Sequence, residues 1–237
     1  MLKKLLAIFG MAYSCISFSK EITAVSWVVA NGDGSIIQSE NLYQQRSIAS
    51  ITKLMTAIVV LEARQDLEQY FKPYTRQEMI QLAIVHSDNR ASESLCQHYP
   101  GGRSQCIQAM NDKARSLGMI NTKFVDPTGL GVQNVSTAYD LIKLVRAAEL
   151  YPEIVSASKM SEVKIKIKKK WLIFKNTNPI IGKRHDFIIS KTGWIRASGG
   201  CIVMMLDTDI GRRIVVVLGS KNTHTRIPEA EFIATHY

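Results

Sequence analysis

The stretch IASITKLMTAIVVLE, residues 48–62, decides how the rest of the chain can fold. With a helical repeat, its apolar side chains form a broad surface that few polar residues interrupt. A helix of this kind is stable when other parts of the chain bury it. We therefore predict a buried central helix over residues 50–64.

Two polar residues at the start of this helix, Ser50 and Lys53, stand three positions apart and share one face. Serine is a favoured helix N-cap, so the spacing alone has a purely structural interpretation. A serine hydroxyl becomes a good nucleophile when a base removes its proton, and a lysine is such a base only when neutral. Because the lysine pKa is ordinarily about 10.4, Lys53 needs an apolar environment and a second cation nearby. The helix supplies the first condition, and the second has to come from elsewhere in the chain.

The first 19 residues combine Lys3 and Lys4 with an apolar run and small residues just before residue 20. This is the layout of a secretory signal peptide, so we predict that residues 20–237 form the mature chain. A lipoprotein signal around Cys15 is the alternative, although Tyr13 fits it poorly. No later stretch is apolar for long enough to span a membrane.

The whole chain carries 30 Lys and Arg against 20 Asp and Glu, a formal charge of +10. Without Lys3 and Lys4 the charge is +8, which suits an anionic partner such as the cell wall or a membrane surface. Much of it lies in VKIKIKKK, residues 163–170, whose alternation is typical of a strand with one solvated face. We interpret these lysines as protection of an exposed strand edge. Since no Arg-rich arm, zinc spacing or aromatic RNA-binding motif accompanies them, we expect no nucleic-acid partner.

Three cysteines follow residue 19. Cys96 and Cys106 flank a short stretch that contains HYPGG, and an oxidising compartment would let them form a disulfide. Cys201 stays unpaired in the apolar run CIVMML, which predicts a buried strand residue. The His and Cys spacings match no metal site, so we expect no metal and no cofactor.

The pattern of the whole chain predicts one α/β domain over residues 20–237. Apolar runs on both sides of the Asn-Gly-Asp-Gly turn at 31–34 predict an N-terminal hairpin. The middle is helical, with further helices at residues 76–86, 90–98, 104–117 and 136–150, the last capped by Ser136 or Thr137.

After residue 152 the repeat changes to two, which predicts strands near residues 162–169, 187–195, 201–206 and 213–218. A helix over residues 226–236 closes the chain. Strands at both ends around a helical middle imply one antiparallel sheet, built from both chain ends, with helices packed on it.

Two more motifs follow the first in sequence. Ser87-Asp88-Asn89 ends the helical segment RQEMIQLAIVH, and Lys191-Thr192-Gly193 lies in the predicted strand FIISKTGWI. Asp88 also has a structural interpretation, as the cap of a helix that begins near Asn89. Ser-x-x-Lys, Ser-Asp-Asn and Lys-Thr-Gly in this order resemble the penicillin-binding proteins and class A β-lactamases.

Longer stretches extend the resemblance from about residue 22 to the C-terminus. The segments RSIASITKLMTAIVVLEA, HSDNRASESLCQHYPGG, KARSLGMINTKFVDPTGL, NVSTAYDL and KTGWIRASGGC are similar to the low-molecular-weight penicillin-binding proteins that act as D-alanyl-D-alanine peptidases. They resemble the endopeptidase branch most. The resemblance implies a β-lactamase/D,D-peptidase-like fold in the bacterial periplasm or cell envelope, with at most peripheral membrane association.

The resemblance also implies an activity, for which three hypotheses remain. The first is a serine D,D-endopeptidase that cuts D-Ala to diaminopimelate cross-links between peptidoglycan stem peptides through an acyl-enzyme on Ser50. The second is a D,D-carboxypeptidase that removes the terminal D-Ala of pentapeptide stems. The third is a non-catalytic penicillin- or wall-binding protein. For the enzyme, the resemblance implies that β-lactam antibiotics are covalent inhibitors.

The resemblance gives a role to each motif residue. Ser50 would attack the D-alanyl carbonyl, Lys53 would be its base, and Ser87 would relay a proton to the leaving amine. Lys191 would be the second cation, which lowers the pKa of Lys53. The residues expected to bind substrate are Asn89, Lys191, Thr192, Gly193, Trp194 and Arg226.

Among these, Asn89 would hold the substrate amide, and the backbone N–H groups of Ser50 and Trp194 would bind the oxyanion. Gly193 would let the substrate lie close against the strand. Lys191, Thr192 and Arg226 would bind the substrate carboxylate. Without the resemblance, Arg226 is more simply a surface residue at the start of a helix.

A β-lactamase would share the three motifs. In class A enzymes a glutamate positioned by an asparagine activates the deacylating water, and no Glu-x-x-x-Asn occurs between Asn89 and Lys191. We therefore expect penicillin to acylate this protein and to leave slowly.

Overall fold

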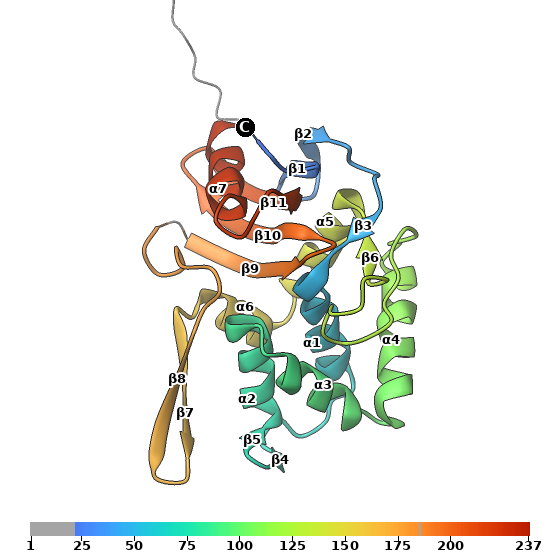
Figure 1. Cartoon of the computed structure of the whole chain (residues 1–237), viewed down its shortest axis with the longest axis vertical. Helices are drawn as coiled ribbons and strands as arrows, with labels where there is room; N and C mark the ends of the chain where they lie inside the picture. Colours follow the sequence, from blue (N-terminus) through green and yellow to red (C-terminus); the bar gives the residue numbers. More distant parts are fainter. Residues whose placement is uncertain (1–21, 185) are drawn as a thin grey trace, which may run out of the picture.

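The computed structural model describes residues 22–184 and 186–237, so the predicted signal peptide lies outside the described residues. The fold is built on a five-stranded antiparallel sheet in the order β2-β1-β11-β10-β9 (Figure 1). Its strands are β1 (Ser26–Asn31), β2 (Ile36–Glu40), β9 (Asp186–Ile195), β10 (Gly199–Thr208) and β11 (Gly211–Ser220). The prediction of one sheet built from both chain ends is confirmed.

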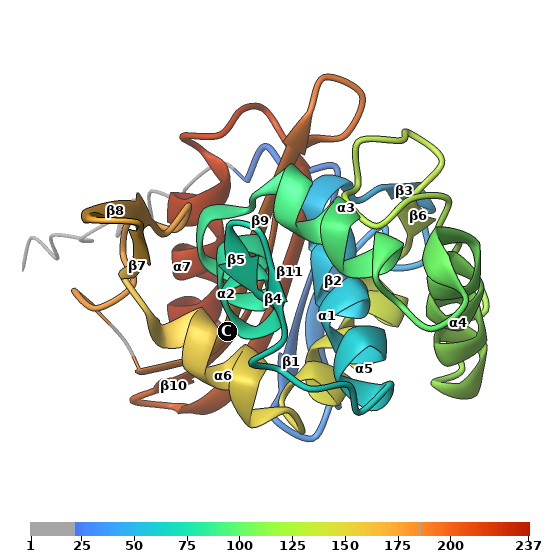
Figure 2. The ribbon, with the colours of Figure 1, turned by 90° about the horizontal axis from the view of Figure 1, so that it is seen from below.

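The helical middle of the chain covers one face of this sheet, and the last helix covers the other (Figures 1 and 2). The middle contains η1 (Ala49–Ile51), α1 (Thr52–Glu62), α2 (Arg76–Gln81), η2 (Leu82–His86), α3 (Asn89–Gln97), α4 (Gly102–Ser116), α5 (Ala138–Ala148) and α6 (Pro152–Lys159). The last helix is α7 (Arg226–His236). The short strand pairs are β3 (Arg46–Ser47) with β6 (Val135–Ser136), and β4 (Tyr70–Phe71) with β5 (Tyr74–Thr75).

Coverage on both faces explains the unbroken apolar runs of the inner strands. In β10, Cys201, Val203 and Met205 pack with the helical middle. The residues between them, Ile202, Met204 and Leu206, point to the other face and pack with α7. Successive side chains of a strand point to opposite faces, so a strand buried on both faces has no polar alternation.

Helix α1 is the most enclosed helix of the middle region, with Thr52 to Val60 all buried. The prediction of a buried central helix is confirmed, but the helix starts differently from the expectation. Ser50 lies inside the 3-10 turn η1, whose N-cap is Ile48, and neither this turn nor α1 has a side-chain cap. Ser50 is therefore not an N-cap, and its hydroxyl is available to another partner.

Other predicted elements agree with the structure within a few residues, and Thr137 caps α5 by accepting a hydrogen bond from the Asp140 N–H. Helix α6, with Pro152 in its first turn, was not predicted. The strand predicted over residues 162–169 ends earlier and belongs to a hairpin of β7 (Glu162–Ile167) and β8 (Lys170–Lys175), separate from the main sheet. The lysines therefore do not protect an edge of the main sheet.

Cys96 in α3 and Cys106 in α4 form the predicted disulfide, and Cys201 is buried and free. The disulfide joins two helices that pack against α1.

Across residues 22–184 and 186–237, every helix is too short or too polar to cross a bilayer.

Loss of the disulfide should destabilise the protein because it releases a short loop in the unfolded chain. Replacing both Cys96 and Cys106 by Ala should lower the free energy of unfolding by roughly 2–3 kcal/mol. Urea unfolding with and without a reductant measures this. The double variant is its own control, since it keeps Cys201 and should not respond to the reductant. An equal loss of stability on reduction in both proteins would contradict the assignment.

Candidate active site

The three sequence motifs meet where η1, the end of η2 and β9 come together. Ser50 comes from η1, and Lys53 from the first turn of α1. Ser87 follows η2 directly, and Asn89 begins α3. Lys191 lies in the middle of β9. The fold thus brings residues separated by up to 141 positions to one place, as the motifs predicted.

The buried amine of Lys53 has three hydrogen-bond partners. Its Nζ lies 2.7 Å from Ser50 Oγ, 2.7 Å from Asn89 Oδ1 and 2.6 Å from the backbone oxygen of Thr128. Two of these partners, an amide oxygen and a backbone carbonyl, can only accept. A neutral amine has two N–H groups and one lone pair. When Lys53 is neutral, its N–H groups therefore go to Asn89 and Thr128, and its lone pair points at the Ser50 hydroxyl.

Burial makes the neutral state accessible, because it lowers the pKa of Lys53 to about 7. The carboxylates of Asp126 and Asp88 act in the opposite direction and limit the shift. Near neutral pH a large fraction of Lys53 is therefore deprotonated.

Lys191 is also buried, and its Nζ donates to Ser87 Oγ at 2.9 Å and to the backbone oxygen of Thr192 at 2.9 Å. Burial lowers the pKa of Lys191 well below its usual value, and the positive charges of Lys53 and Arg226 lower it further. Burial is the largest cause of the low pKa of Lys53, and the repulsion between the two lysines lowers the pKa of Lys191. The expectation that Lys191 also lowers the pKa of Lys53 stays a prediction.

Ser87 has a left-handed backbone conformation, with φ 60° and ψ 32°, directly after the π-helical turn η2. Non-glycine residues rarely adopt this conformation, and π-turns are frequent at functional sites. The turn directs the Ser87 hydroxyl to Lys191. Asp88 caps α3 by accepting from the Ala91 N–H at 2.7 Å, so the structural interpretation of Asp88 is confirmed.

The remaining predicted residues line the end of β9. Arg226 is buried, and its Nη1 donates to the backbone oxygen of Gly193 at 2.7 Å, so the interpretation of Arg226 as a surface residue was wrong. Thr192 Oγ1 donates to Thr177 Oγ1 at 2.7 Å. Trp194, near the end of β9, is half-exposed at the outer rim of the candidate active site.

Gly193 has a structural role that the sequence analysis missed. A Cβ at this position would lie 2.9 Å from the Ile48 oxygen and 3.0 Å from the Ser50 nitrogen. The glycine therefore lets β9 approach the Ser50 turn closely.

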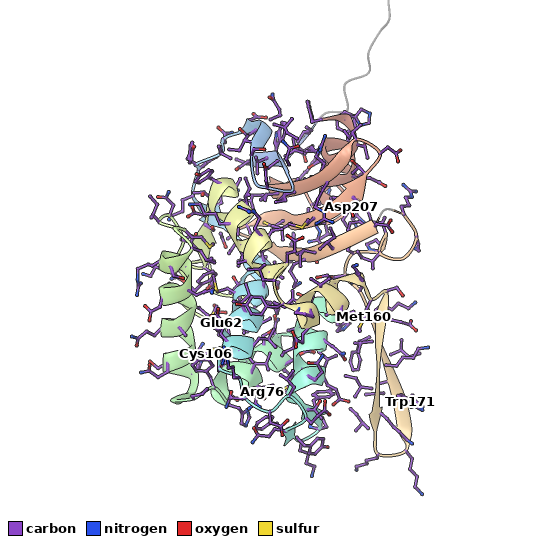
Figure 3. The ribbon with its side chains drawn as sticks, turned by 180° about the vertical axis from the view of Figure 1, so that it is seen from behind. Glu62, Arg76, Cys106, Met160, Trp171 and Asp207 are labelled. Carbon is purple, nitrogen blue, oxygen red and sulfur yellow. A yellow bond between two sulfur atoms is a disulfide. The ribbon has the colours of Figure 1, made fainter. Side chains whose placement is uncertain are left out.

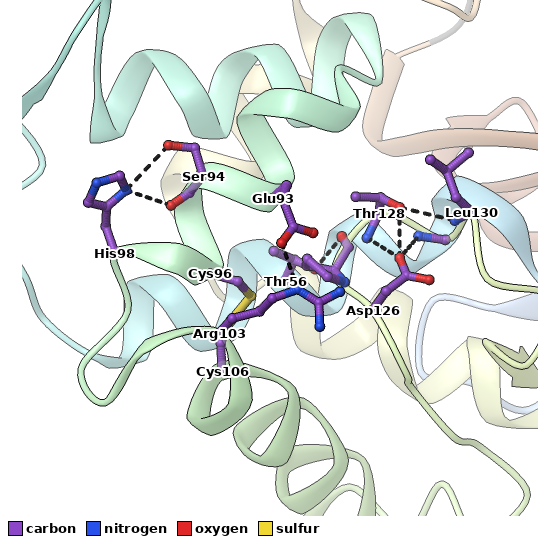
Figure 4. A network of polar contacts seen from close by, with 12 residues as sticks. Thr56, Glu93, Ser94, Cys96, His98, Arg103, Cys106, Asp126, Thr128 and Leu130 are labelled. Atoms are coloured by element: carbon purple, nitrogen blue, oxygen red, sulfur yellow. Dashed lines mark hydrogen bonds and ion pairs between the residues drawn. A yellow bond between two sulfur atoms is a disulfide. The ribbon is translucent and has the colours of Figure 1, made fainter.

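The sequence analysis also missed the contribution of the loop at residues 126–131. The Asp126 carboxylate accepts hydrogen bonds from the N–H groups of Thr128, Gly129 and Gly131. Thr128 also donates to Asp126 through its hydroxyl (Figure 4). Burial alone would raise the pKa of Asp126, but these hydrogen bonds outweigh it and keep the pKa below its usual value. The loop presents the Thr128 carbonyl to Lys53. The signal was the sequence DPTG, which is typical of a turn built on an Asp side chain.

Two cavities adjoin the site. The α3–α4 cavity, of about 610 Å³, includes Asn89 and Thr128, both of which bind Lys53. Its outer wall contains Arg90, Gln97 and the ion pair of Glu93 with Arg103, at 2.6 Å (Figure 4). The α7 cavity, of about 490 Å³, includes Thr177 and Arg226. Within the described part of the chain, no three His, Cys, Asp or Glu side chains gather as a metal site would require.

The Ser50–Lys53 geometry is of the kind that serine enzymes of the acyl-transfer class use, in which a neutral lysine activates a hydroxyl. Comparison with known proteins is more specific. The family model described as D-alanyl-D-alanine carboxypeptidase matches residues 14–73 and 68–222, and the chain belongs to this family of serine D,D-peptidases.

Individual relatives agree with the family. The D-alanyl-D-alanine endopeptidase of Escherichia coli is 36% identical over 97% of this chain and 82% of its own length. The D-alanyl-D-alanine endopeptidase of Pseudomonas aeruginosa is 34% identical over 91% of this chain and 77% of its own length. Among solved structures, the cefotaxime-bound penicillin-binding protein from Listeria monocytogenes is 25% identical, with a TM-score of 0.79 over 90% of this chain and 96% of its own.

Gly129 holds the Asp126 loop against the Ser50 turn and should not tolerate a side chain. A Cβ there would lie 1.9 Å from the Ala49 oxygen and 2.8 Å from the Ser50 nitrogen. Gly129→Ala should therefore destabilise the protein by about 1–3 kcal/mol more than a control with the same backbone strain. The control is Gly118→Ala, because Gly118 also has a positive φ but its nearest neighbour is a lysine Nζ at 3.6 Å. Equal losses in urea unfolding would show that only backbone strain matters.

Proposed function

We propose that this chain is an endopeptidase that hydrolyses D-Ala to diaminopimelate cross-links of peptidoglycan through an acyl-enzyme on Ser50. The observation that carries the proposal is the geometry of Lys53. Its two obligate acceptors, Asn89 and the Thr128 carbonyl, leave its lone pair directed at the Ser50 hydroxyl. A base placed and deprotonated in this way is what a serine nucleophile needs.

In the proposed reaction, Ser50 Oγ attacks the D-alanyl carbonyl while Lys53 takes its proton. The tetrahedral oxyanion lies between the backbone N–H groups of Ser50 and Trp194. When the intermediate collapses, the C–N bond breaks and the proton that Lys53 took passes through Ser87 to the leaving amine, so Lys53 is neutral again. Ser87 is held for this by its hydrogen bond from Lys191. Water then attacks the acyl-enzyme with Lys53 again acting as the base. Penicillin enters by the same first step and, without a class A glutamate, leaves slowly.

The substrate carboxylate would bind beside Lys191, Thr192 and Arg226. Lys191, in the middle of β9, and Arg226, at the start of α7, are both buried, and Thr192 has its hydroxyl beside them. The guanidinium of Arg226 already bonds the Gly193 oxygen, so Arg226 also fixes the strand that the substrate would lie against. Asn89 would direct its amide nitrogen to a substrate carbonyl, because its oxygen is bound to Lys53.

The choice of endopeptidase over carboxypeptidase rests on room for the leaving residue. A carboxypeptidase releases free D-alanine, whereas an endopeptidase releases a whole stem peptide. The α7 cavity adjoins Thr177 and Arg226, next to the proposed carboxylate site, and is large enough for additional residues. The endopeptidase names of the relatives from Escherichia coli and Pseudomonas aeruginosa support the same choice. Release of terminal D-Ala is the alternative.

The proposed setting is the bacterial periplasm or cell envelope, because that is where cross-linked peptidoglycan is found. Residues 1–19 would direct export, and the Cys96–Cys106 disulfide suits an oxidising compartment. Detection of a mature chain that begins at Lys20 tests this point.

Ser50→Ala should abolish both cleavage of muropeptides and covalent labelling by a fluorescent penicillin. The variant lacks the oxygen that forms the acyl-enzyme, and removal of one hydroxyl in the turn should leave the fold intact. Labelling is measured on denatured protein, with thermal unfolding as the control for folding. Labelling of the variant at wild-type stoichiometry would overturn the assignment of Ser50.

The rate constant for acylation by penicillin should rise with pH and level off above about 7, because deprotonation of Lys53 supplies the base. Lys53→Ala should remove this limb and slow acylation roughly 10²–10⁴-fold. Lys191→Ala should weaken penicillin binding and leave the midpoint of this rise in rate near pH 7, because burial is the largest cause of the low pKa of Lys53. A limb that moves in Lys191→Ala would show that Lys191 does control that pKa.

Cleavage of a cross-linked muropeptide dimer should be faster than release of D-Ala from a pentapeptide monomer under identical conditions. Thr223→Trp, which would fill the α7 cavity, should slow dimer cleavage more than D-Ala release. Gln97→Trp in the α3–α4 cavity is the matched control and should not change the ratio of the two rates in this direction. Faster pentapeptide trimming by the unmodified protein would make the carboxypeptidase reading correct without changing the role of Ser50.

A further inference from the structure

The β7–β8 hairpin has no part in the proposed chemistry, yet its surface is unusual. In Figures 1 and 3 the hairpin runs alongside the helical layer, and its tip is clear of other elements. Its base is fixed, because Val163 and Ile165 are buried and the strands contact η2. The base is therefore anchored to the body while the outer part faces solvent.

The outer part is strongly basic. Between residues 162 and 175 there are six lysines and a single acid, Glu162, which pairs with Lys164 at 3.3 Å. The six are exposed along both strands and the turn: Lys164, Lys166, Lys168, Lys169, Lys170 and Lys175. Positive charge at this density favours an anionic surface.

Exposed apolar side chains accompany this charge. Trp171, Leu172 and Ile173 are consecutive residues of β8 and are 63%, 40% and 55% exposed. Exposed apolar side chains in such a group mark an interaction surface more often than isolated ones do.

The strand register places these side chains on both faces of the hairpin. Trp171 stands opposite Lys166, with the lysine Nζ 5.9 Å from the indole centroid. Ile173, two residues further on, shares this outer face, whereas Leu172 stands opposite Ile165 on the inner face. The outer face therefore combines lysines with Trp171 and Ile173. The inner face has Leu172 close to the lysine-rich turn.

A bilayer surface matches this combination better than other anionic partners do. Carboxylates of the cell wall would account for the lysines but not for the exposed Trp171. A folded protein partner would cover one face of a hairpin, whereas a bilayer interface surrounds an element that enters it. Tryptophan is enriched at the level of the lipid headgroups, and lysines there contact anionic phosphates while their stems cover apolar surface.

We infer that the β7–β8 hairpin is a docking element for membranes that contain anionic phospholipid. Trp171 and its apolar neighbours enter the headgroup region to a shallow depth, and the lysines bind lipid phosphates. The hairpin thereby holds the domain reversibly at a membrane surface. This inference does not depend on the proposed peptidase activity.

The experiment uses vesicles of phosphatidylethanolamine with phosphatidylglycerol, compared with vesicles of phosphatidylcholine alone, in a sedimentation assay. The unmodified protein should bind the anionic vesicles, and binding should weaken as salt is added. The double change Lys168→Glu with Lys169→Glu should weaken binding at least ~10-fold. Its matched control is Lys183→Glu with Lys221→Glu, which makes the same change in net charge at exposed positions outside the hairpin and should bind nearly as the unmodified protein does.

A second pair of variants tests the apolar contribution. Trp171→Ala should weaken binding to anionic vesicles roughly ten-fold, whereas Tyr70→Ala, at a similarly exposed aromatic residue, should not. A thermal unfolding midpoint of every variant close to that of the unmodified protein shows that the domain is folded. Equal binding by all variants would overturn the inference, as would loss in the lysine variant alone together with salt-sensitive binding to isolated sacculi. The latter result would mean that the hairpin binds wall carboxylates instead of a bilayer.

Discussion

The structure depends on the burial of one lysine. A pKa of about 7 for Lys53, against an ordinary value of 10.5, corresponds to roughly 5 kcal/mol against the charged form. This is a large part of the net stability of a typical domain, about 5–15 kcal/mol. The protein can accommodate such a group because α1 is enclosed by the sheet and by the other helices. The neutral amine also has a hydrogen-bond partner for each of its two N–H groups and for its lone pair.

The same requirement explains why distant parts of the chain have to meet. Lys53 obtains its fixed acceptors from α3 and from the loop at residues 126–131, and these two segments follow α1 in the helical middle. The second lysine, Lys191, comes from β9, which pairs with β10 near the C-terminal end of the chain. Because β1 pairs with β11, the two chain ends form one sheet, and β9 is set against the turn that carries Ser50. The site is complete only when the whole chain has folded.

Sequence reasoning was most successful where side chains have a fixed spacing. Three short motifs singled out Ser50, Lys53, Ser87, Asn89 and Lys191, which the fold brings together. The strands of the sheet were also predicted close to their observed bounds, although the inner ones are unbroken apolar runs and not an alternation. It missed the Thr128 carbonyl, because a backbone acceptor leaves no signature in residue type.

Other differences have equally physical reasons. A lysine-rich strand of the main sheet and a lysine-rich hairpin have the same period of two, so the separate β7–β8 hairpin could not be distinguished. The burial of Arg226 depends on a tertiary contact with Gly193. The origin of the low pKa of Lys53 depends on how completely the fold removes water, which no local pattern records.

The Ser50 turn is held between two glycines that come from distant parts of the chain. A Cβ at Gly129 or at Gly193 would collide with backbone atoms of residues 48–50, so both contacts are made without any side chain between the backbones. Side-chain substitutions therefore have little scope to adjust the position of the nucleophile. In an evolving population, variants that escape β-lactams while keeping activity would have to alter the rim, at positions such as Trp194 or the walls of the two cavities. Substitutions in the turn itself would disturb the backbone contacts with Gly129 and Gly193.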